Sequence, residues 1–324
     1  MTINRRTFLA GAAALSLSGL ALPVRAQNWP TRPIRLVVPY PPGGSSDIIA
    51  RIISQPLSQA LGQTVVVENK PGANGNLGAG LVAQSGQDGH SLLLCDVGAL
   101  AISPSVYTKL TFNPSTDLRP VSMLAYSPHV LAVNPQVPAK TLAELVALSK
   151  KERINFAVTA IGSAPHLAAV AIQEATGAQW EYVPYKGGAQ AVTDTVGGQT
   201  QIIINGLLAT LPHIKNGNLR AIAISSAEPM KLVPDIPTIA SQGVPGFQSG
   251  TWQGIMAPSS MNEQTAQMLA DALAKIVTQP DIQAKLNEQG AEVVIKKTAE
   301  LGAFYVAERD RWAAVVKRAD IRLD

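Results

Sequence analysis

Residues 36–52 read LVVPYPPGGSSDIIARI, and this stretch decides how we expect the chain to fold. The apolar run Ile34–Val38 is typical of a strand that is buried on both faces. Three prolines and two glycines in residues 39–44 end that strand. Ser45 or Ser46 can then cap a helix in which isoleucines recur at helical spacing. A strand, a Gly-Gly turn and a helix start together direct free backbone N–H groups at one point, which suits an anion.

The same pattern has a simpler explanation, because many strand-to-helix turns contain Gly and Ser merely to make the corner. The stretch alone leaves an anion site and a plain turn equally open. The sequence lacks the pattern G-x-x-x-x-G-K-[ST], which excludes a nucleotide P-loop. A loop of N–H groups and hydroxyls without a fixed cation suits a carboxylate better than a triphosphate.

Residues 1–26 have the pattern of an export signal. Arg5 and Arg6 precede an apolar run over residues 9–22, and a small-x-small cleavage motif ends at Ala26. The run is too short for a comfortable membrane span, so we expect cleavage after Ala26 and a mature protein in the bacterial periplasm. The sequence leaves the general and the twin-arginine export routes equally open.

The charge balance points away from nucleic acid. The chain has 26 basic and 22 acidic residues and a formal charge of +4. Three of the arginines and no acid lie in the predicted signal, so its removal lowers the charge to about +1. With no basic stripe, we expect no nucleic-acid partner. The remaining length is sufficient for two domains of ordinary size, and no other apolar run is long enough to cross a membrane.

Residues with catalytic or metal-binding chemistry form no recognisable motif. The single cysteine, Cys95, lies in an apolar run and is typical of a buried structural thiol. Four histidines are scattered without the spacing of metal ligands: His90, His129, His166 and His213. The sequence has no G-x-S-x-G elbow, no Cys–His pair with local support and no G-x-G-x-x-G dinucleotide motif. We therefore expect no metal, no cofactor and no enzyme activity.

Strand-like and helical segments alternate along the mature chain, with short apolar runs at residues 64–68 and 91–95 after the first strand. This alternation indicates a parallel α/β sheet, in which ligands bind beyond the carboxyl ends of the strands. Polar or glycine-rich turns follow predicted strands at residues 69–76, 96–98, 161–166, 183–190 and 205–206. The C-terminal part is predicted to be helical, with apolar stripes that begin at Ala266 and Leu301 and pack on the sheet of the first domain.

Several of these turns also carry a family likeness. The motifs are PYPPGGSSD (39–47), ENKPGANG (68–75), GSAPH (162–166), VPYKGGA (183–189), LPHIKNGNLRA (211–221) and PDIPT (234–238). In this order and spacing they resemble the Bug family, the periplasmic receptors of tripartite tricarboxylate transporters. The likeness covers the whole mature chain.

The resemblance implies an α/β fold of the type II periplasmic binding class, a Venus-flytrap in which two domains enclose the ligand. Domain 1 is expected to comprise residues 27–125 and 251–324, and domain 2 residues 126–250. The chain would cross between them near residues 125–129 and 250–253, and these hinge crossings would absorb the closure.

In this family one carboxylate is held by the loop matching residues 43–46 and by the turns matching 162–164 and 186–189, often with ordered water. The candidate ligand-binding residues are Tyr40, Gly43, Gly44, Ser45, Ser46, Ala73, Asp96, Gly162, Ser163, Ala164, His166, Tyr185, Lys186, Gly187, Gly188, Ala189 and Asn205. The distal wall of the cleft is expected at residues 96–98, 126–128, 205–207 and 251–252.

Some of these positions have alternative explanations. Ala164 stands where another small polar residue is common in the family, and Asn205 where the family often has aspartate. An aspartate there would suit an amino group, so the neutral Asn205 favours a dicarboxylate or aromatic carboxylate over an amino acid. His166 near a helix start can equally pack or cap, and Lys186 can simply be solvated. Asp47, in the first turn of a helix, is more typical of a capping or dipole partner than of a general base.

The residues and the resemblance together predict a monomeric solute receptor. It would deliver a small carboxylate to the integral-membrane subunits of a tripartite tricarboxylate-type transporter. The alternative is a receptor whose ligand-bound form signals to a periplasmic sensor domain. An enzyme on this fold is a third hypothesis, disfavoured because the sequence offers no nucleophile–base pair and no cofactor motif.

Overall fold

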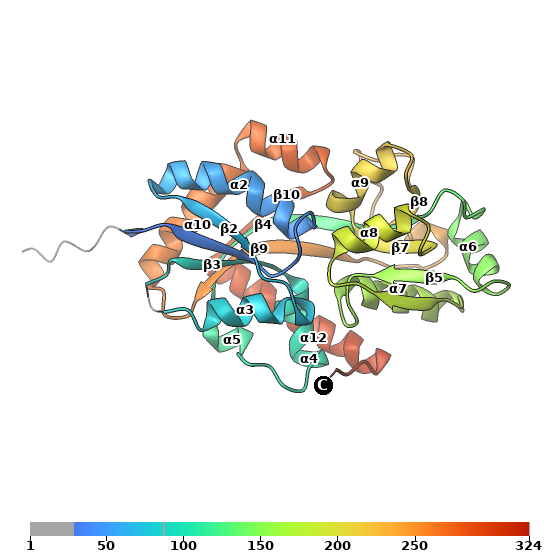
Figure 1. Ribbon diagram of the computed structural model, residues 1–324, viewed down its shortest axis with the longest axis horizontal. Coiled ribbons are helices and arrows are strands. Elements are labelled where there is room, and N and C mark those ends of the chain that lie inside the picture. The colour runs from blue at the N-terminus through green and yellow to red at the C-terminus, as the bar shows by residue number, and fades with distance from the viewer. Residues whose placement is uncertain (1–28, 87, 324) are drawn as a thin grey trace, which may run out of the picture.

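The computed structural model describes residues 29–86 and 88–323 (Figure 1). The predicted export signal, residues 1–26, lies outside the described residues. Of the helices that are described, none is long and apolar enough to cross a membrane.

Within the described residues, ten strands pair into one curled sheet. Along the sheet the order is β2-β1-β3-β9-β4-β7-β5-β6, and β10 and β8 also pair with β4. The strands are β1 Ile34–Val38, β2 Val65–Asn69, β3 Ser91–Asp96, β4 Leu118–Val133, β5 Asn155–Val158, β6 Glu181–Pro184, β7 Ile202–Gly206, β8 Arg220–Ile224, β9 Gly250–Pro258 and β10 Glu292–Lys297. Strands β1 to β3 pair in parallel with one another, as do β5 to β7, which confirms the predicted α/β class.

The long strand β4 links two halves of the molecule. Its residues 118–128 pair antiparallel with β9, and its residues 129–133 pair antiparallel with β7. We call the half with β1, β2, β3 and β10 the first lobe, and the half with β5, β6, β7 and β8 the second lobe. Figure 1 shows the two lobes side by side along the longest axis, with β4 and β9 running between them.

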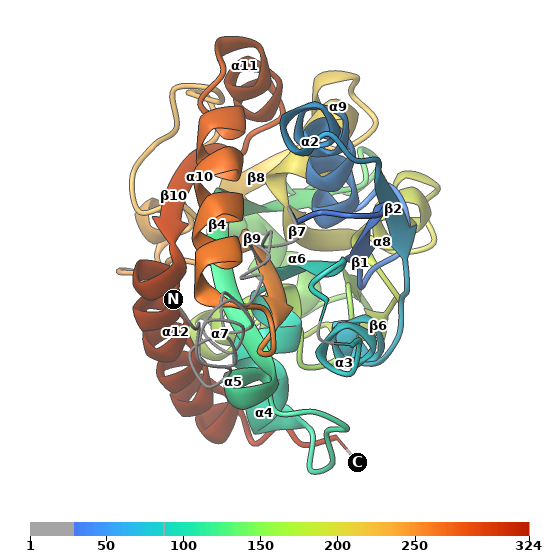
Figure 2. The same cartoon turned by 90° about the vertical axis from the view of Figure 1, so that its left-hand side faces the viewer.

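Helices cover both faces of each lobe (Figures 1 and 2). They are α2 Ser45–Leu61, α3 Asn76–Ala83, α4 Ser103–Val106, α5 Pro114–Asp117, α6 Leu142–Ser149, α7 Ala164–Thr176, α8 Gly188–Val196, α9 Leu207–Lys215, α10 Glu263–Val277, α11 Pro280–Glu288 and α12 Thr298–Ala319, with short turns η1 Ala73–Gly75, η2 Gly98–Ile102 and η3 Ala240–Gln242. In the first lobe α2, α10 and α11 lie on one face of the sheet, and α3, α4 and α12 on the other. In the second lobe α8 and α9 lie opposite α7.

The apolar stripes predicted for the C-terminal helices are buried against the first lobe. On α10, Leu269 and Leu273 have no exposed surface and pack in one cluster with Leu36 of β1. On α12, Leu301 and Trp312 are almost fully buried in a second cluster on the opposite face. Because burial of each such side chain stabilises the fold by roughly 1.5–3 kcal/mol, the C-terminal helices are an integral part of this lobe.

Two local expectations are wrong. The C-terminal part is not helical throughout, because residues 292–297 form β10, whose Val-Val-Ile run is rich in β-branched residues that favour a strand. The N-cap of α2 is Gly44 and not Ser45 or Ser46, and no side chain caps this helix. The Ser45 hydroxyl instead lies against the second lobe, where a Cβ added to Gly206 would be 2.7 Å from it.

Candidate ligand-binding site

A narrow cavity lies between the two lobes, where the loops after β1, β3, β5 and β7 meet. Its volume is about 50 Å³, enough for a few water-sized groups. It is lined by Tyr40, Gly44, Ser45, Ser46, Asn74, Asp96, Val97, Gly98, Thr159, Ser163, Ala164, Pro165, Gly188, Asn205, Gly206 and Thr251. This place, beyond the carboxyl ends of the strands, is the one that open α/β sheets favour for ligands.

The structure brings many of the predicted residues to this cavity and leaves others outside it. Those that line it are Tyr40, Gly44, Ser45, Ser46, Asp96, Ser163, Ala164, Gly188 and Asn205. Those that do not are Gly43, Ala73, Gly162, His166, Tyr185, Lys186, Gly187 and Ala189. Of the expected distal wall, Val97, Gly98, Gly206 and Thr251 contribute, whereas residues 126–128, Leu207 and Trp252 do not. The lining residues that sequence reasoning missed are Asn74, Thr159 and Pro165.

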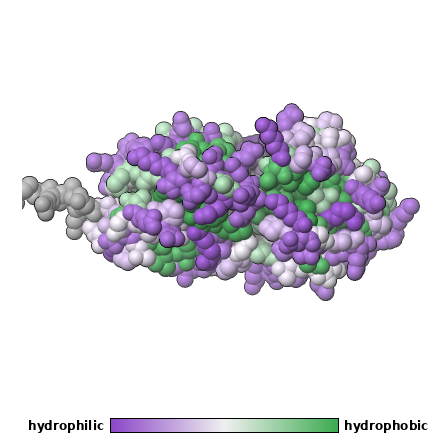
Figure 3. Space-filling model, turned by 90° about the horizontal axis from the view of Figure 1, so that it is seen from above, coloured by the Kyte–Doolittle hydropathy of each residue, from purple (hydrophilic) through white to green (hydrophobic). Residues whose placement is uncertain are grey.

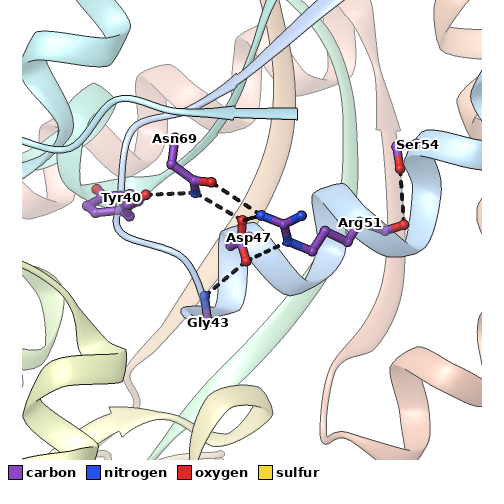
Figure 4. Close-up of polar contacts among 6 residues, drawn as sticks. All are labelled: Tyr40, Gly43, Asp47, Arg51, Ser54 and Asn69. Carbon is purple, nitrogen blue, oxygen red and sulfur yellow. Dashed lines mark hydrogen bonds and ion pairs between the residues drawn. The ribbon is translucent and has the colours of Figure 1, made fainter. Parts of the chain in front are cut away.

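The loop before α2 is held by the carboxylate of Asp47 (Figure 4). This carboxylate accepts hydrogen bonds from the Gly43 N–H and from Asn69 Nδ2, each at 2.9 Å. Arg51 binds it as well, with Nε at 2.9 Å and Nη2 at 3.0 Å. Burial alone would raise the pKa of Asp47, but these bonds, first that from Arg51, lower it, so the group is ionised. Asp47 therefore shapes the loop and does not line the cavity.

Tyr40 and Asp96 form a polar pair in the cavity wall. Tyr40 Oη donates to Asp96 Oδ1 at 2.6 Å, and the Gly98 N–H donates to the same oxygen at 2.8 Å. Only glycine leaves room beside the pair, because a Cβ on Gly98 or on Gly75 would lie 2.9 Å from Tyr40 Oη. Burial raises the pKa of Asp96 to about 6, even though the hydrogen bonds from Tyr40 and Gly98 lower it.

Helix α7 begins at the cavity with Ser163 as its N-cap. Ser163 Oγ accepts a hydrogen bond from the His166 N–H at 3.3 Å. The His166 ring packs edge-on against Tyr182 at 4.8 Å between centroids, and its Nδ1 accepts the Gly162 N–H at 3.1 Å. Burial lowers the pKa of His166 to about 4, so the ring is neutral at pH 7. In the structure His166 supports the turn before α7 from behind the lining residues.

Helix α8 is the third helix to begin at the cavity. A Cβ added to Gly188 would lie 2.7 Å from Asn205 Oδ1, so the backbone at the helix start touches the Asn205 amide directly. Asn205 Nδ2 donates to Thr210 Oγ1 at 3.3 Å. Lys186 is exposed and Tyr185 half-buried, and both lie outside the cavity lining.

The two lobes touch each other around the cavity. Asn74 Nδ2 in the first lobe donates to the carbonyl oxygen of Gly162 in the second, at 3.4 Å. Gly187 packs so closely on Pro41 that an added Cβ would lie 2.6 Å from Pro41 Cδ. These contacts define a closed cleft.

The electrostatics of the cavity suit an anion. Helices α2, α7 and α8 all begin at its wall, and each directs the positive end of its dipole towards it. Neither α2 nor α8 has a side-chain cap, so the N–H groups of their first turns are available. At α7 the His166 N–H is bonded to Ser163 and Pro165 has no N–H, so Ala164 supplies the donor there. Among the residues that the structure describes, no lysine, arginine or histidine lines the cavity, and the carboxylate there is that of Asp96.

The donor groups that line the cavity are of the kind that bind an organic ligand. Within residues 29–86 and 88–323, no three or more His, Cys, Asp or Glu side chains lie close enough together to hold a metal ion. The lining groups are hydroxyls, amides and backbone, with a single carboxylate, a set that suits the polar groups of an organic ligand.

A larger open groove of about 1570 Å³ lies on the outer surface of the first lobe. Its lining residues come from α2, α10, α11 and the connection between the last two. Acidic and basic side chains balance there: Arg51, Lys275 and Lys285 against Glu263, Asp271 and Asp281. Figure 3 shows this side of the molecule from above, with a mostly hydrophilic surface. The groove has no excess positive charge, and the helix starts that line it, those of α10 and α11, carry the acids Glu263 and Asp281 in their first turns. The smaller cavity is therefore the better anion site.

Two α/β lobes that are linked by two strands and close on a ligand cavity define the class of periplasmic binding proteins. Residues 49–321 match the family described as "Tripartite tricarboxylate transporter family receptor", and the chain belongs to this family. The match confirms the family that the sequence motifs indicate.

Relatives and solved structures agree with this assignment. The chain is 37% identical to protein BugT of Bordetella pertussis over 312 residues, which is 95% of this chain and 96% of BugT. It is 32% identical to the periplasmic binding protein BugD, whose structure superposes with a TM-score of 0.87 over 91% of this chain and 99% of BugD. A structure of Rpa4515 from R. palustris with adipate gives 32% identity and a TM-score of 0.88, covering 91% and 99% of the two chains. The structure of MatC from Rhodopseudomonas palustris, with bound malate, gives 30% identity and a TM-score of 0.83, and it covers 89% of this chain and 100% of MatC.

Proposed function

We propose that this protein is a solute receptor that binds a small carboxylate in the cavity between its lobes. The receptor would then deliver it to the membrane subunits of a tripartite tricarboxylate-type transporter. The observation that carries the proposal is the convergence of the N-termini of α2, α7 and α8 on one cavity without a basic side chain. Each helix N-terminus stabilises an anion by about 0.3–1 kcal/mol at an exposed site, and by more where water is excluded. Several such interactions hold a carboxylate and still allow release when the cleft opens.

The proposed ligand is a dicarboxylate or an aromatic carboxylate. Two related structures contain adipate and malate, both aliphatic dicarboxylates. Asn205, near the end of β7 and against the start of α8, is neutral and therefore offers no counter-charge for an amino group at that point. Of the candidate residues, those that line the cavity are proposed to contact the ligand, and Gly43, Gly162, Gly187 and Ala189 to shape the loops around it.

We propose residues 27–125 with 251–324, and residues 126–250, as two domains that move relative to each other. This division is supported by β4 and β9, which connect the lobes. The receptor would work as a monomer in the periplasm, exported by residues 1–26, without enzyme activity, cofactor or nucleic-acid partner. The same cavity would serve a receptor for a periplasmic sensor domain, and capture of the membrane partner separates the two roles.

The experiment that tests the function is a thermal-shift screen of residues 27–324, followed by calorimetry on every compound that raises the melting temperature. The panel contains aliphatic dicarboxylates, tricarboxylates, aromatic carboxylates, acidic amino acids and nicotinate-like rings. A carboxylate that stabilises the protein at low concentration supports the proposal, because a ligand that binds only the folded state raises its stability. If no anion raised the melting temperature, the proposed function would be wrong. If only amino acids did, the preference drawn from Asn205 would be wrong.

A further inference from the structure

We propose that Asp96 accepts a hydrogen bond from a donor group of the bound ligand, so that the site prefers carboxylates that carry a hydroxyl or ammonium group over plain carboxylates. The inference rests on the proposed function and specifies its ligand class. It departs in one respect from the preference drawn from Asn205, because an ammonium group that finds no counter-charge at Asn205 finds one at Asp96. It assigns two parts of the cavity wall different tasks: the helix N-termini bind the carboxylate, and Asp96 accepts from the donor.

The first step is that Asp96 has acceptor capacity to spare. A carboxylate offers about four lone-pair positions. Tyr40 Oη and the Gly98 N–H both bond Oδ1, and the Ala99 N–H also interacts with the group. With three donors for about four positions, Asp96 can accept at least one further hydrogen bond, and it lies in the cavity wall.

The second step is that Asp96 has no cationic partner. No ion pair between described side chains includes Asp96, whereas the buried Asp47, in the first turn of α2, is paired with Arg51. A carboxylate that is withdrawn from water is normally paired or fully hydrogen-bonded. A ligand donor would complete its environment, whereas a second plain carboxylate placed there would be repelled.

The third step concerns the residue opposite Asp96 on the neighbouring strand. Gln253 of β9 is the direct cross-strand partner of Asp96 of β3, so their side chains lie on the same face of the sheet. Gln253 is fully buried, and among the described residues neither Nε2 nor Oε1 of its amide has a hydrogen-bond partner. Gln253 does not itself line the cavity, but unsatisfied buried amides are rare in native proteins, which indicates that a further polar group, an ordered water or part of a ligand, belongs beside the Asp96–Gln253 pair.

The fourth step is that the surrounding fold fixes the positions of Tyr40 and Asp96. Gly75 and Gly98 leave the space that the Tyr40 hydroxyl needs, since a Cβ on either would lie 2.9 Å from it. Tyr40 itself is only 8% exposed and belongs to the core cluster of the first lobe. The position of Asp96 is therefore fixed before a ligand arrives, which is what a specificity-determining residue requires.

The test compares ligands that differ only in the donor. Calorimetry on the unmodified protein measures the dissociation constants of succinate, methylsuccinate, L- and D-malate, and L- and D-aspartate, and of glutarate, 2-hydroxyglutarate and glutamate. We expect at least one hydroxyl or ammonium member to bind about tenfold or more tightly than its plain counterpart. The malate and aspartate arms distinguish a hydroxyl donor from an ammonium donor, and methylsuccinate controls for size.

The variant D96N has nearly the same shape without the charge. We expect D96N to bind the donor-bearing ligand more weakly and the plain ligand more tightly, so that their dissociation constants differ by no more than about threefold. D281N, which removes an acid on the exposed surface of α11, is the matched control and should keep the preference of the wild type. If D96N does not fold, the ligand ranking on the unmodified protein still decides.

Two negative outcomes are distinguishable. Plain members that bind as tightly as their donor-bearing counterparts, or a D96N variant with an unchanged preference, would overturn this inference and leave the proposed function standing. If no carboxylate of either kind bound, including those of the wider screen, the proposed function itself would fail.

Discussion

The neutral ring of His166 links a single residue to the acid stability of the protein. Burial lowers its pKa to about 4, whereas histidine in an unfolded chain titrates near 6.5. In acid the unfolded chain therefore binds a proton that the folded chain does not. The contribution of the neutral His166 ring to the free energy of unfolding is fully present above pH 6.5 and is lost as the pH is lowered towards 4. At pH 5 the loss is about 2 kcal/mol. We predict that H166N, which keeps an acceptor for the Gly162 N–H but cannot ionise, loses less stability in acid, as measured by urea unfolding between pH 5 and 8.

The test compares the pH dependence of stability in H166N with that in the wild type, because other groups titrate in the same pH range. Burial lowers the pKa of His129 to about 3, which adds to the acid loss, and raises that of Asp96 to about 6, which opposes it. Both groups are present in the variant and in the wild type, so their contributions cancel. Equal pH slopes for H166N and the wild type would show that the ring takes up a proton as readily in the folded protein as in the unfolded chain.

Asp47 and Arg51 form one ion pair but should differ sharply in importance. The side chain of Asp47 is 3% exposed and that of Arg51 is 56% exposed. D47A removes the acceptor of the Gly43 N–H and of Asn69, and we expect it to lower the free energy of unfolding by about 2–3 kcal/mol. R51A removes one exposed partner and should cost only about 0–1 kcal/mol. Urea unfolding of both variants gives the comparison, and similar losses would contradict the view that Asp47 holds the loop.

At the scale of elements, the strand–turn–helix units could be predicted because their signals are local. The apolar run Ile34–Val38 is β1 as expected, and the Pro- and Gly-rich segment leads into α2. The Gly-Ser-Ala-Pro sequence before α7 likewise gives a helix with Ser163 at its N-cap and proline in its first turn. In both places three or four neighbouring residues determine the backbone, so a single sequence is sufficient.

What could not be predicted depends on segments that are distant in the chain. Asn74 reaches Gly162 across 88 residues, and neither the Asn-Gly turn nor the Gly-Ser turn indicates that the two meet. Thr159 lines the cavity only because of how the second lobe closes on the first. β10 forms where the edge of β4 is free to pair with it. Periodicity shows which face of a segment is buried but not which segment packs against it.

Substitutions of Ser163, the N-cap of α7, can separate the effect of helix capping on stability from the effect of charge on ligand binding. Ser163 caps the helix and lines the cavity, so its replacement affects both. Asn and Asp are both good N-caps and differ by one charge. We predict that S163N and S163D have similar melting temperatures, and that S163D binds a carboxylate at least tenfold more weakly because it places a negative charge at the anion site. Thermal melts and calorimetry with the tightest ligand of the screen measure the two properties.

S163A completes the set, since it lacks a cap but carries no charge. It should lower the free energy of unfolding by about 0.5–2 kcal/mol, and it should reduce the affinity for the ligand far less than S163D does. If S163D and S163N bound the ligand equally well, the carboxylate would not lie at the start of α7.

At the scale of the whole molecule, binding depends on how the lobes close. His129 on β4 is fully buried where the lobes join, with its ring 2.8 Å from Ser249 Oγ and 2.9 Å from Thr251 Oγ1. Thr251 also lines the cavity, so one side chain belongs both to the connecting strands and to the proposed site. We therefore expect these strands to take up the rotation of the lobes, as element ends do in hinge motions.

The contact of Gly187 with Pro41 allows closure to be changed without touching the cavity. Gly187 has an extended backbone, with φ of −175°, so alanine fits there without strain. Its Cβ, however, would lie 2.6 Å from Pro41 Cδ and would push the lobes apart. We predict that G187A shifts the population towards an open form, with a larger radius of gyration in small-angle X-ray scattering. Its affinity for the ligand should be about tenfold or more lower, because the closed state that binds becomes rarer.

The controls distinguish closure from folding. Alanine is a poorer N-cap than glycine, so G187A should also lose up to about 1 kcal/mol at the start of α8, too little to unfold the lobe. G86A is the matched control, because a Cβ at Gly86 meets no atom within 4 Å, and it should leave both the affinity and the radius of gyration unchanged. If G187A bound the ligand as tightly as the wild type, the second lobe could bind without resting on Pro41. The closed cleft would then not be the state that holds the carboxylate.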